Sequence, residues 1–176
     1  MIRQVVVLGL VLLATVANGH FAIFSPAVRA GSNDLTEPVA PCGGLPLGAR
    51  SQFPVAGGSI TGALYHPTAE ANFSLVVSNS DPTNAQFAVT WFGPGENAAF
   101  TEGGFSVPID LTAVQGCVVG ANATLQVVMI TVDGTLHECM DVTLIQSNLS
   151  STSTTATKSD APSSLLASLS LLSVAL

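Results

Sequence analysis

Apolar residues form short alternating runs in the middle of the chain and two unbroken blocks at its ends. The middle is rich in Val, Thr, Phe, Gly and Pro and lacks a sustained helical period. Its alternation predicts strands at residues 58–65, 71–79, 85–92, 123–132 and 135–146. Asp133-Gly134 is a two-residue hairpin signal, because a type I′ turn needs positive φ at both positions. These features predict a small all-β domain, an antiparallel immunoglobulin-like β-sandwich, over residues 20–146.

The N-terminal block, residues 1–19, has the form of a secretory signal peptide. Arg3 supplies the positive charge, and the apolar run that follows is shorter than the roughly 20 residues needed to span a bilayer. Ala17 and Gly19 place small residues at the two positions that signal peptidase reads. We expect cleavage after Gly19, which makes His20 the mature N-terminus. Cleavage after Ala17 is the competing prediction.

The C-terminal block, residues 165–176, is uncharged and follows a Ser/Thr-rich stretch at residues 147–164. Such a stretch cannot bury enough apolar surface to fold and is typical of an O-glycosylated stalk. A small-residue polar segment followed by a terminal apolar tail is typical of glycosylphosphatidylinositol (GPI) attachment, in which the tail is removed. Residues 151–159 offer several attachment points. The alternative is a tail that is merely disordered.

Charge is scarce once these ends are set aside. The whole chain is 48% hydrophobic and 9% charged, with a formal charge of −7. Between positions 20 and 155, Arg29 and Arg50 face ten carboxylates, a balance of −8. This acidity excludes a nucleic-acid partner. Three N-glycosylation sequons agree with passage through the secretory pathway, at Asn72, Asn122 and Asn148.

The chain has three cysteines, and an oxidising compartment favours one disulfide with one thiol left over. The preferred pair is Cys42 with Cys139, which would tie the long N-terminal segment to the final strand. In the chain-entropy model such a loop contributes roughly 3–5 kcal/mol. The sequence alone allows all three pairings, including those with Cys117.

Two histidines suggest a metal site. An N-terminal His20 offers its α-amine and its ring Nδ1 within one chelate ring, and a second imidazole completes three nitrogens in a T. This set suits the tetragonal preference of Cu(II). His66 follows the strand predicted to end at Tyr65 and precedes Pro67, so it is expected at a sheet end. The alternative is a solvated surface histidine.

A series of motifs then resembles one family. In order, they are His20-Phe21 with Pro26 and Arg29, Pro41-Cys42-Gly43-Gly44, Arg50-Ser-Gln-Phe53-Pro54 with Gly57-Gly58, His66, and Cys139-Met-Asp141-Val142-Thr143. This order resembles the fungal copper-acquisition-factor family, the histidine-brace proteins related in fold to lytic polysaccharide monooxygenases (LPMOs). It covers residues 20–144. The chain departs from the family where Ser106 follows Gly104-Phe105, because a cysteine usually stands there.

The resemblance implies an LPMO-like fold and a protein that binds one Cu(II) in copper acquisition or homeostasis. It implies three copper ligands, which by position are His20, His66 and Asp141. It also implies a GPI-anchored protein on the outer face of the plasma membrane or in the cell wall. A membrane copper transporter is a possible recipient of the copper.

The sequence places Asp141 two residues after Cys139 in the last predicted strand, so both side chains lie on one face. A bridge to Cys42 would hold this face near the segment that carries His20. The alternative for Asp141 is an exposed strand-edge carboxylate. His137 lies on the same nominal face and is interpreted as a surface residue, with an alternative ligand as the second interpretation.

Three functions compete: a copper-binding protein of the cell surface, a copper-dependent LPMO acting on cell-wall polysaccharide, and a structural wall protein. Oxidising a polymer needs an open coordination position and a flat platform with exposed aromatic side chains. Beyond its phenylalanines, the mature chain has only Tyr65 and Trp91. The first function, with no catalytic activity, is therefore favoured.

Overall fold

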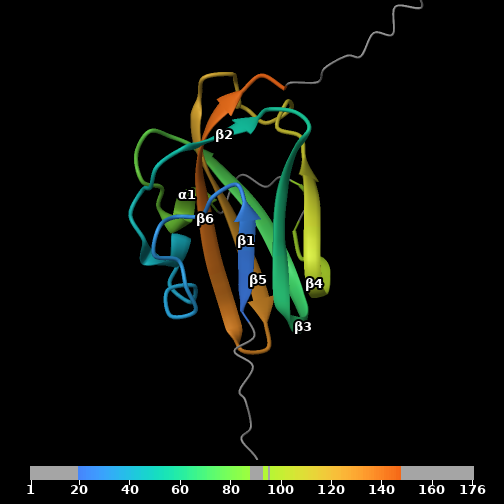
Figure 1. The fold of residues 1–176 in the computed structure, drawn as a ribbon. Coiled ribbons are helices and arrows are strands. Elements are labelled where there is room, and N and C mark those ends of the chain that lie inside the picture. The colour runs from blue at the N-terminus through green and yellow to red at the C-terminus, as the bar shows by residue number, and fades with distance from the viewer. Residues whose placement is uncertain (1–19, 88–92, 95, 148–176) are drawn as a thin grey trace, which may run out of the picture.

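The computed structural model describes residues 20–87, 93–94 and 96–147 (Figure 1). These residues form a 3-10 helix η1, a one-turn helix α1 and a mixed sheet of six strands. The strands are β1 (Phe21–Ser25), β2 (Ser51–Pro54), β3 (Gly58–Val77), β4 (Ala98–Ile109), β5 (Asn122–Thr131) and β6 (Gly134–Ile145); η1 is Cys42–Gly44 and α1 is Asn84–Phe87. The predicted all-β class is confirmed.

Several predictions concern residues outside the described part of the chain. They are the signal peptide, residues 88–92 of the strand predicted at 85–92, Asn148, the stalk beyond Ser147 and the C-terminal tail. Within residues 20–87, 93–94 and 96–147, no helix is long or apolar enough to cross a membrane.

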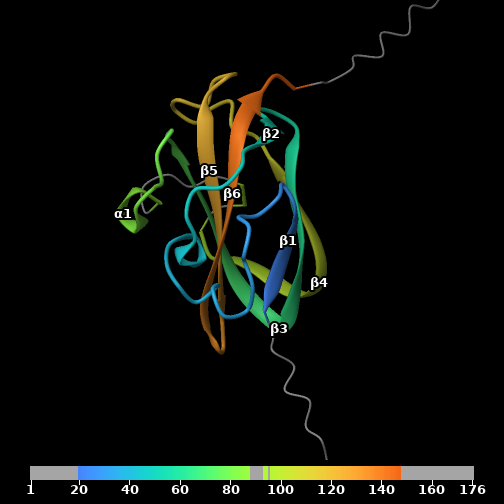
Figure 2. The same cartoon turned by 60° about the vertical axis from the view of Figure 1, so that its left-hand side comes forward.

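The sheet is wound around its longest strand, β3. One edge of β3 pairs with β4, while β1 and then β5 follow one another along its other edge. β5 pairs with β6 and β6 with β2, the last pair being parallel and the other pairs antiparallel. The two halves of β3 thus belong to two layers, and Figures 1 and 2 show the sheet curled into a sandwich.

The middle of β3 is irregular. The pairing with β4 shifts register between Leu64 and Thr68, a segment that contains His66 and Pro67. Proline cannot donate a ladder hydrogen bond, and irregularities of this kind bend a strand. In Figure 1 this middle part lies at the lower end of the molecule, beside the start of β1 and the β5–β6 turn. His66 therefore lies at the end of the sandwich where β1 begins.

The core fills the space between the layers. Its fully buried side chains include Phe21 of β1, Phe73 of β3, Leu125 of β5 and Met140 of β6. Alternation in β5 and β6 directs one set of residues into this core and the other set to a face covered by the loop before β2. That loop brings buried polar groups onto the second face.

The predicted strands at 123–132 and 135–146 correspond to β5 and β6 within one residue at each end. The strands predicted at 58–65 and 71–79 are the two halves of β3. β1, β2 and β4 were not predicted. β4 contains Gly103 and Gly104, and its exposed stretch lacks regular alternation.

The predicted strand at 85–92 is wrong at its start, where residues 84–87 form α1. Gln86 Oε1 accepts both the backbone N–H and the hydroxyl of Thr83, so Thr83 and Gln86 form part of a capping box. The type I′ turn is also wrong. Thr131 pairs with Gly134, so Val132 and Asp133 form the turn, and of the four only Gly134 has positive φ.

The preferred disulfide is confirmed, since Cys42 and Cys139 are bonded. The bridge closes a separation of 97 residues and fixes η1 against β6. Cys117 is free and buried, and burial raises the pKa of its thiol. It is therefore a core side chain of low reactivity.

Candidate metal centre

His20 stands at the start of β1, opposite the strand that carries the second predicted histidine. Its carbonyl accepts a hydrogen bond from the backbone N–H of Tyr65 at 2.8 Å. This bond extends the β1–β3 register, in which Phe21 pairs with Leu64. His20 is thereby held opposite Tyr65, one residue from His66.

A loop after β1 brings two carboxylates to His20. The backbone N–H of Arg29 donates to the carbonyl of Cys139 at 3.0 Å, and that of His137 donates to the carbonyl of Glu37 at 2.7 Å. These bonds hold the loop along β6. Glu37 is consequently buried, with 2% of its surface exposed.

His20 contacts both carboxylates. Its Nδ1 lies 2.8 Å from Oε2 of Glu37, a hydrogen bond, and its Nε2 lies 4.0 Å from Oδ2 of Asp34. One ligand atom from each of the three residues lies within 4.8 Å of the others, a spacing that could hold a metal ion. Burial raises the pKa of Glu37, and its hydrogen bond to His20 opposes that rise only in part.

His66 is buried, with 3% of its surface exposed, so the alternative of a solvated histidine is wrong. Its Nδ1 lies 3.6 Å from Oδ2 of Asp133 in the β5–β6 turn. Its Nε2 is buried and has no hydrogen-bond partner among the described residues. A buried nitrogen without a partner costs about 1–3 kcal/mol, which a ligand to that nitrogen would offset.

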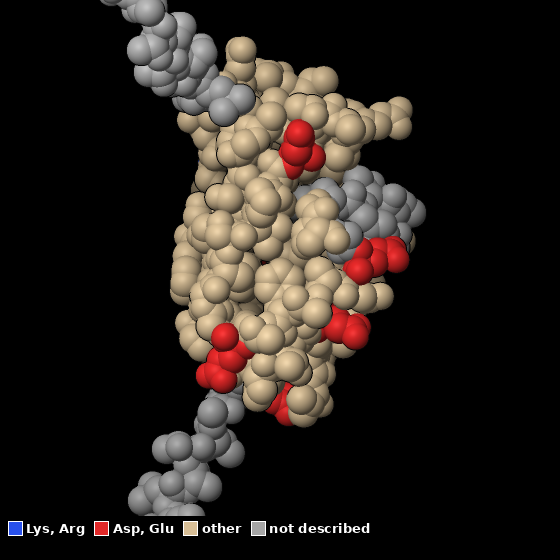
Figure 3. Space-filling view, turned by 90° about the vertical axis from the view of Figure 1, so that its right-hand side faces the viewer, with Lys and Arg blue, Asp and Glu red and all other residues tan. Residues whose placement is uncertain are grey.

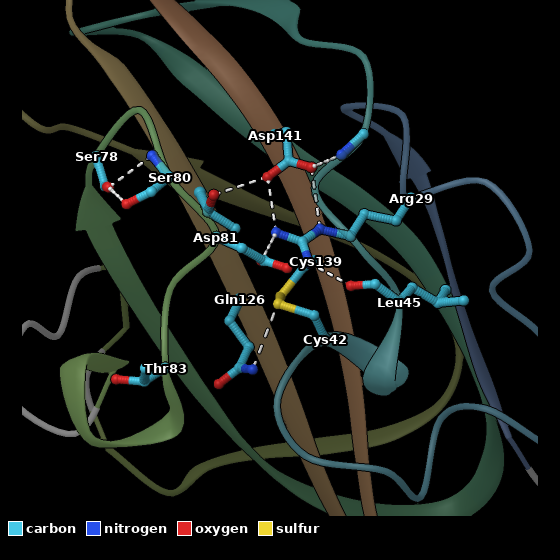
Figure 4. Close-up of polar contacts among 12 residues, drawn as sticks. Arg29, Cys42, Leu45, Ser78, Ser80, Asp81, Thr83, Gln126, Cys139 and Asp141 are labelled. Carbon is cyan, nitrogen blue, oxygen red and sulfur yellow. Dashed lines mark hydrogen bonds and ion pairs between the residues drawn. A yellow bond between two sulfur atoms is a disulfide. The ribbon is translucent and has the colours of Figure 1, made fainter.

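Asp141 is occupied elsewhere (Figure 4). Its carboxylate accepts hydrogen bonds from Arg29 Nε and Nη2 at 3.0 and 3.1 Å, from the backbone N–H of Gly48 at 2.7 Å and from the Thr124 hydroxyl at 2.7 Å. Asp81 lies 2.9 Å from the same guanidinium. Asp141 is 1% exposed, so the alternative of an exposed edge carboxylate is wrong. The structure does not bring Asp141 into the group around His20, and its role as a copper ligand stays a prediction.

A further buried carboxylate, Glu138, links β6 to β1 and to the loop. Its Oε2 accepts the backbone N–H of Ile23 at 2.9 Å, and its Oε1 accepts the hydroxyl of Ser32 at 2.8 Å. Burial raises the pKa of Glu138 to about 7, and the nearby charge of Glu37 adds to the rise. The two hydrogen bonds act in the opposite direction.

This pKa predicts a pH-dependent stability of the metal-free protein. The folded pKa of about 7 exceeds the unfolded value of about 4.3, so the unfolded state binds fewer protons between these values. The contribution of Glu138 to the free energy of unfolding is fully present below about pH 4.3 and is lost as the pH rises through 7, on the order of 3–4 kcal/mol. Glu138→Gln should remove most of this decrease in urea-unfolding measurements. Glu102→Gln, at an exposed position, should leave the decrease in stability with pH unchanged. An equally steep decrease in Glu138→Gln and in the unmodified protein would contradict the assignment of this pKa to Glu138.

His137, interpreted from the sequence as a surface residue, is buried with 9% of its surface exposed. Burial lowers the pKa of its ring. Its side chain faces a hollow on the outer face of β5 and β6, with Gln126 and Asn72. His137 does not belong to the metal-type cluster of the described residues.

The charges of the described surface are almost all negative. Arg29 is buried against Asp141, and Arg50 donates to the carbonyls of Ala123, Val142 and Ser78. Figure 3 shows one face with several carboxylates and no Lys or Arg. Such a field favours the approach of a cation, while the ligands decide its affinity.

The sequence identified His20 as a site residue but missed Glu37 and Asp34; His66 is not among the three residues of this cluster in the described part of the chain, and its role as a copper ligand stays a prediction. No spacing rule relates these carboxylates to His20, because the loop reaches it only through hydrogen bonds to β6. The family resemblance instead implied Asp141 as the carboxylate ligand. The one available signal was a carboxylate pair close to an N-terminal histidine in a chain poor in charge.

The fold and the cluster together define a class, a small β-sandwich domain with an imidazole–carboxylate group suited to a metal ion. Residues 18–161 match the family described as copper acquisition factor BIM1-like, and the chain belongs to this family. Its function is therefore copper-related.

The chain is also similar to a lytic polysaccharide monooxygenase-like protein, X325, of Yarrowia lipolytica. The two are 31% identical over 148 residues, which cover 78% of this chain and 54% of the relative. The chain thus spans about half the length of this relative.

Proposed function

We propose that the mature protein begins at His20 and binds one Cu(II) through a histidine brace in copper acquisition. The brace consists of the α-amine and Nδ1 of His20 together with a nitrogen of His66. The observation that carries this proposal is the buried, unpartnered Nε2 of His66, one residue from the position opposite His20. Copper supplies the electrophilic centre that these nitrogens bind.

Glu37 supplies the carboxylate of this proposed copper site. Its Oε2 lies 2.8 Å from Nδ1 of His20, whereas both oxygens of Asp141 are already hydrogen-bonded to Arg29, Gly48 and Thr124. Ion pairing and hydrogen bonds hold Asp141 in place, so a metal would have to compete with a buried arginine. Asp34, whose side chain is 57% exposed, is a weaker second carboxylate.

We place the protein at the outer face of the plasma membrane or in the cell wall, attached by a GPI anchor. A membrane copper transporter is the proposed recipient of its copper. This location is supported by the sequence patterns of both ends. A structural wall protein, in which the histidines have no metal role, is the outcome if no metal binds.

The alternative function is a copper-dependent LPMO, which the name of the Yarrowia relative favours. A polysaccharide platform needs exposed aromatic side chains beside the metal. Tyr65, 51% exposed and opposite His20, is one such side chain, and Phe24, 63% exposed, lies further along β1. Among the described residues these two separated rings give a small platform, so copper binding without polymer oxidation is the favoured function.

Titration of the processed protein with Cu(II) tests the proposal. Binding should saturate at one copper per domain, with a tetragonal, nitrogen-rich electron paramagnetic resonance (EPR) spectrum. Incubation of the loaded protein with a reductant, oxygen and cell-wall polysaccharide should release no oxidised oligosaccharides. Their release would establish the monooxygenase instead.

Glu37→Gln should lower the Cu(II) affinity about 10–100-fold, the range seen when a group next to the metal ligands is lost. Copper bound to Nδ1 of His20 would replace the hydrogen bond between Nδ1 and Glu37, so that the Glu37 carboxylate would lie beside the ion. The EPR spectrum should change as well, because a carboxylate beside the metal becomes an amide. Asp34→Asn removes a charge at a similar place in the loop and should change the affinity less than about threefold. An unchanged spectrum and affinity in Glu37→Gln would contradict this role of Glu37 and favour Asp141 as the carboxylate ligand.

A further inference from the structure

The hollow that His137 borders lies on the outer face of β3, β5 and β6, and its lining includes none of His20, Asp34 and Glu37. It measures about 180 Å³, and Asn72, Ser74, Asn84, Phe87, Gln126 and His137 line it. A cavity of about 150 Å³ is large enough for a six-membered carbon ring. The hollow therefore has room for one sugar-sized ring.

The lining suits a neutral, polar ring. It contains three amide side chains, a hydroxyl, an imidazole and one aromatic ring, and no charged side chain. Gln126 is 2% exposed and donates through Nε2 to Cys139 Sγ at 3.7 Å. Amides that bind hydroxyls and an acetamide, next to an aromatic face, match the chemistry of an N-acetylhexosamine.

Two of these lining residues belong to a glycosylation sequon, Asn72-Phe73-Ser74. In a strand, residues two apart point to the same face, so both Asn72 and Ser74 border the hollow. The Oδ1 of Asn72 accepts the backbone N–H of Asn97 at 2.6 Å, which orients the amide. Its Nδ2, the atom that carries a glycan, donates to none of the described residues.

We propose that Asn72 is glycosylated and that the first N-acetylglucosamine of its glycan occupies this hollow. The sugar is covalently held beside the amides and Phe87, so its contacts need no free-ligand affinity. Its hydroxyls and acetamide bind Gln126 and Asn84, and its apolar face packs on Phe87. The attached sugar thus completes the outer face of the second layer and stabilises the fold, independently of copper.

The test uses the full chain with Asn122→Gln and Asn148→Gln, made in yeast, so that Asn72 is the sole sequon. One sample is trimmed by an endoglycosidase to a single N-acetylglucosamine, and the other comes from cells treated with an inhibitor of N-glycosylation. The single-sugar form should melt about 3–6 °C higher. Phe87→Ala should reduce this difference in melting temperature to below about 1 °C. If Phe87→Ala does not fold, Asn84→Ala takes its place and should also reduce the difference.

A matched chain with Asn72→Gln and Asn148→Gln leaves Asn122 as its sole sequon and should show a difference below about 1 °C. Peptide mass spectrometry reports the occupancy of each site. An unmodified Asn72, equal melting temperatures of the two Asn72 forms, or a difference that survives both pocket variants would each overturn the proposal.

Discussion

One extra residue before His20 is expected to lower the affinity for Cu(II) about 10²–10⁴-fold, the size of the advantage that linked ligands have over separate ones. The added residue converts the α-amine into an amide and removes it from the chelate ring with Nδ1. His66→Ala should cause a loss of similar size, because it removes the buried nitrogen that has no other partner. Competition titration and EPR spectroscopy measure both losses.

His137→Ala is the matched control for His66→Ala, since both rings are buried and carry a nitrogen without a partner among the described residues, but His137 is not part of the proposed brace. It should change the affinity less than about threefold, as expected for a side chain without a metal contact. Equal binding by the processed and the extended proteins would exclude a brace that uses the α-amine. N-terminal sequencing of the purified mature protein shows whether His20 is its first residue.

The second large effect is expected at Asp141. Asp141→Asn should destabilise the fold by about 3 kcal/mol, because it leaves the guanidinium of Arg29 buried without its main counter-charge. Urea unfolding measures this loss. Asp81→Asn changes the exposed partner of the same guanidinium and should cost less than about 1 kcal/mol. Similar losses in the two variants would contradict the assignment.

The same variant separates the two carboxylate proposals. If Glu37 serves the metal, folded Asp141→Asn keeps the EPR spectrum of the unmodified protein although it unfolds at lower urea. If Asp141 is a ligand, as the family resemblance implies, the spectrum changes in the folded protein. The comparison is made well below the unfolding midpoint, so that loss of structure does not contribute.

Local patterns were sufficient for the strands whose alternation is regular. β5 and β6 bury every second side chain in the core, and their predicted bounds are within one residue of the structure. β1 is a strand of only five residues, and β2 pairs in parallel with β6 from a distant part of the chain. The start of α1 reads as a strand because its residues are followed by β-formers, although the Thr83 and Gln86 spacing already indicates a capped turn.

For the candidate metal ligands, too, some features follow from the sequence and others only from the fold. The position of His20 after a predicted signal cleavage site indicates its chemistry, and the following proline places His66 at an irregular strand position. The backbone proximity of their two segments, however, depends on the β1–β3 register, which pairs residues 36 to 43 positions apart. No local pattern fixes that register.

The sequence by itself determined an acidic, all-β domain, the preferred Cys42–Cys139 pair and the two histidines of interest. Only the tertiary structure decided which carboxylate pairs with which basic side chain. Asp141 pairs with Arg29 across 112 positions, and Glu37 reaches His20 through a loop that is hydrogen-bonded to β6. Buried charges take the partners that the packed strands bring to them, and this packing is a property of the whole chain.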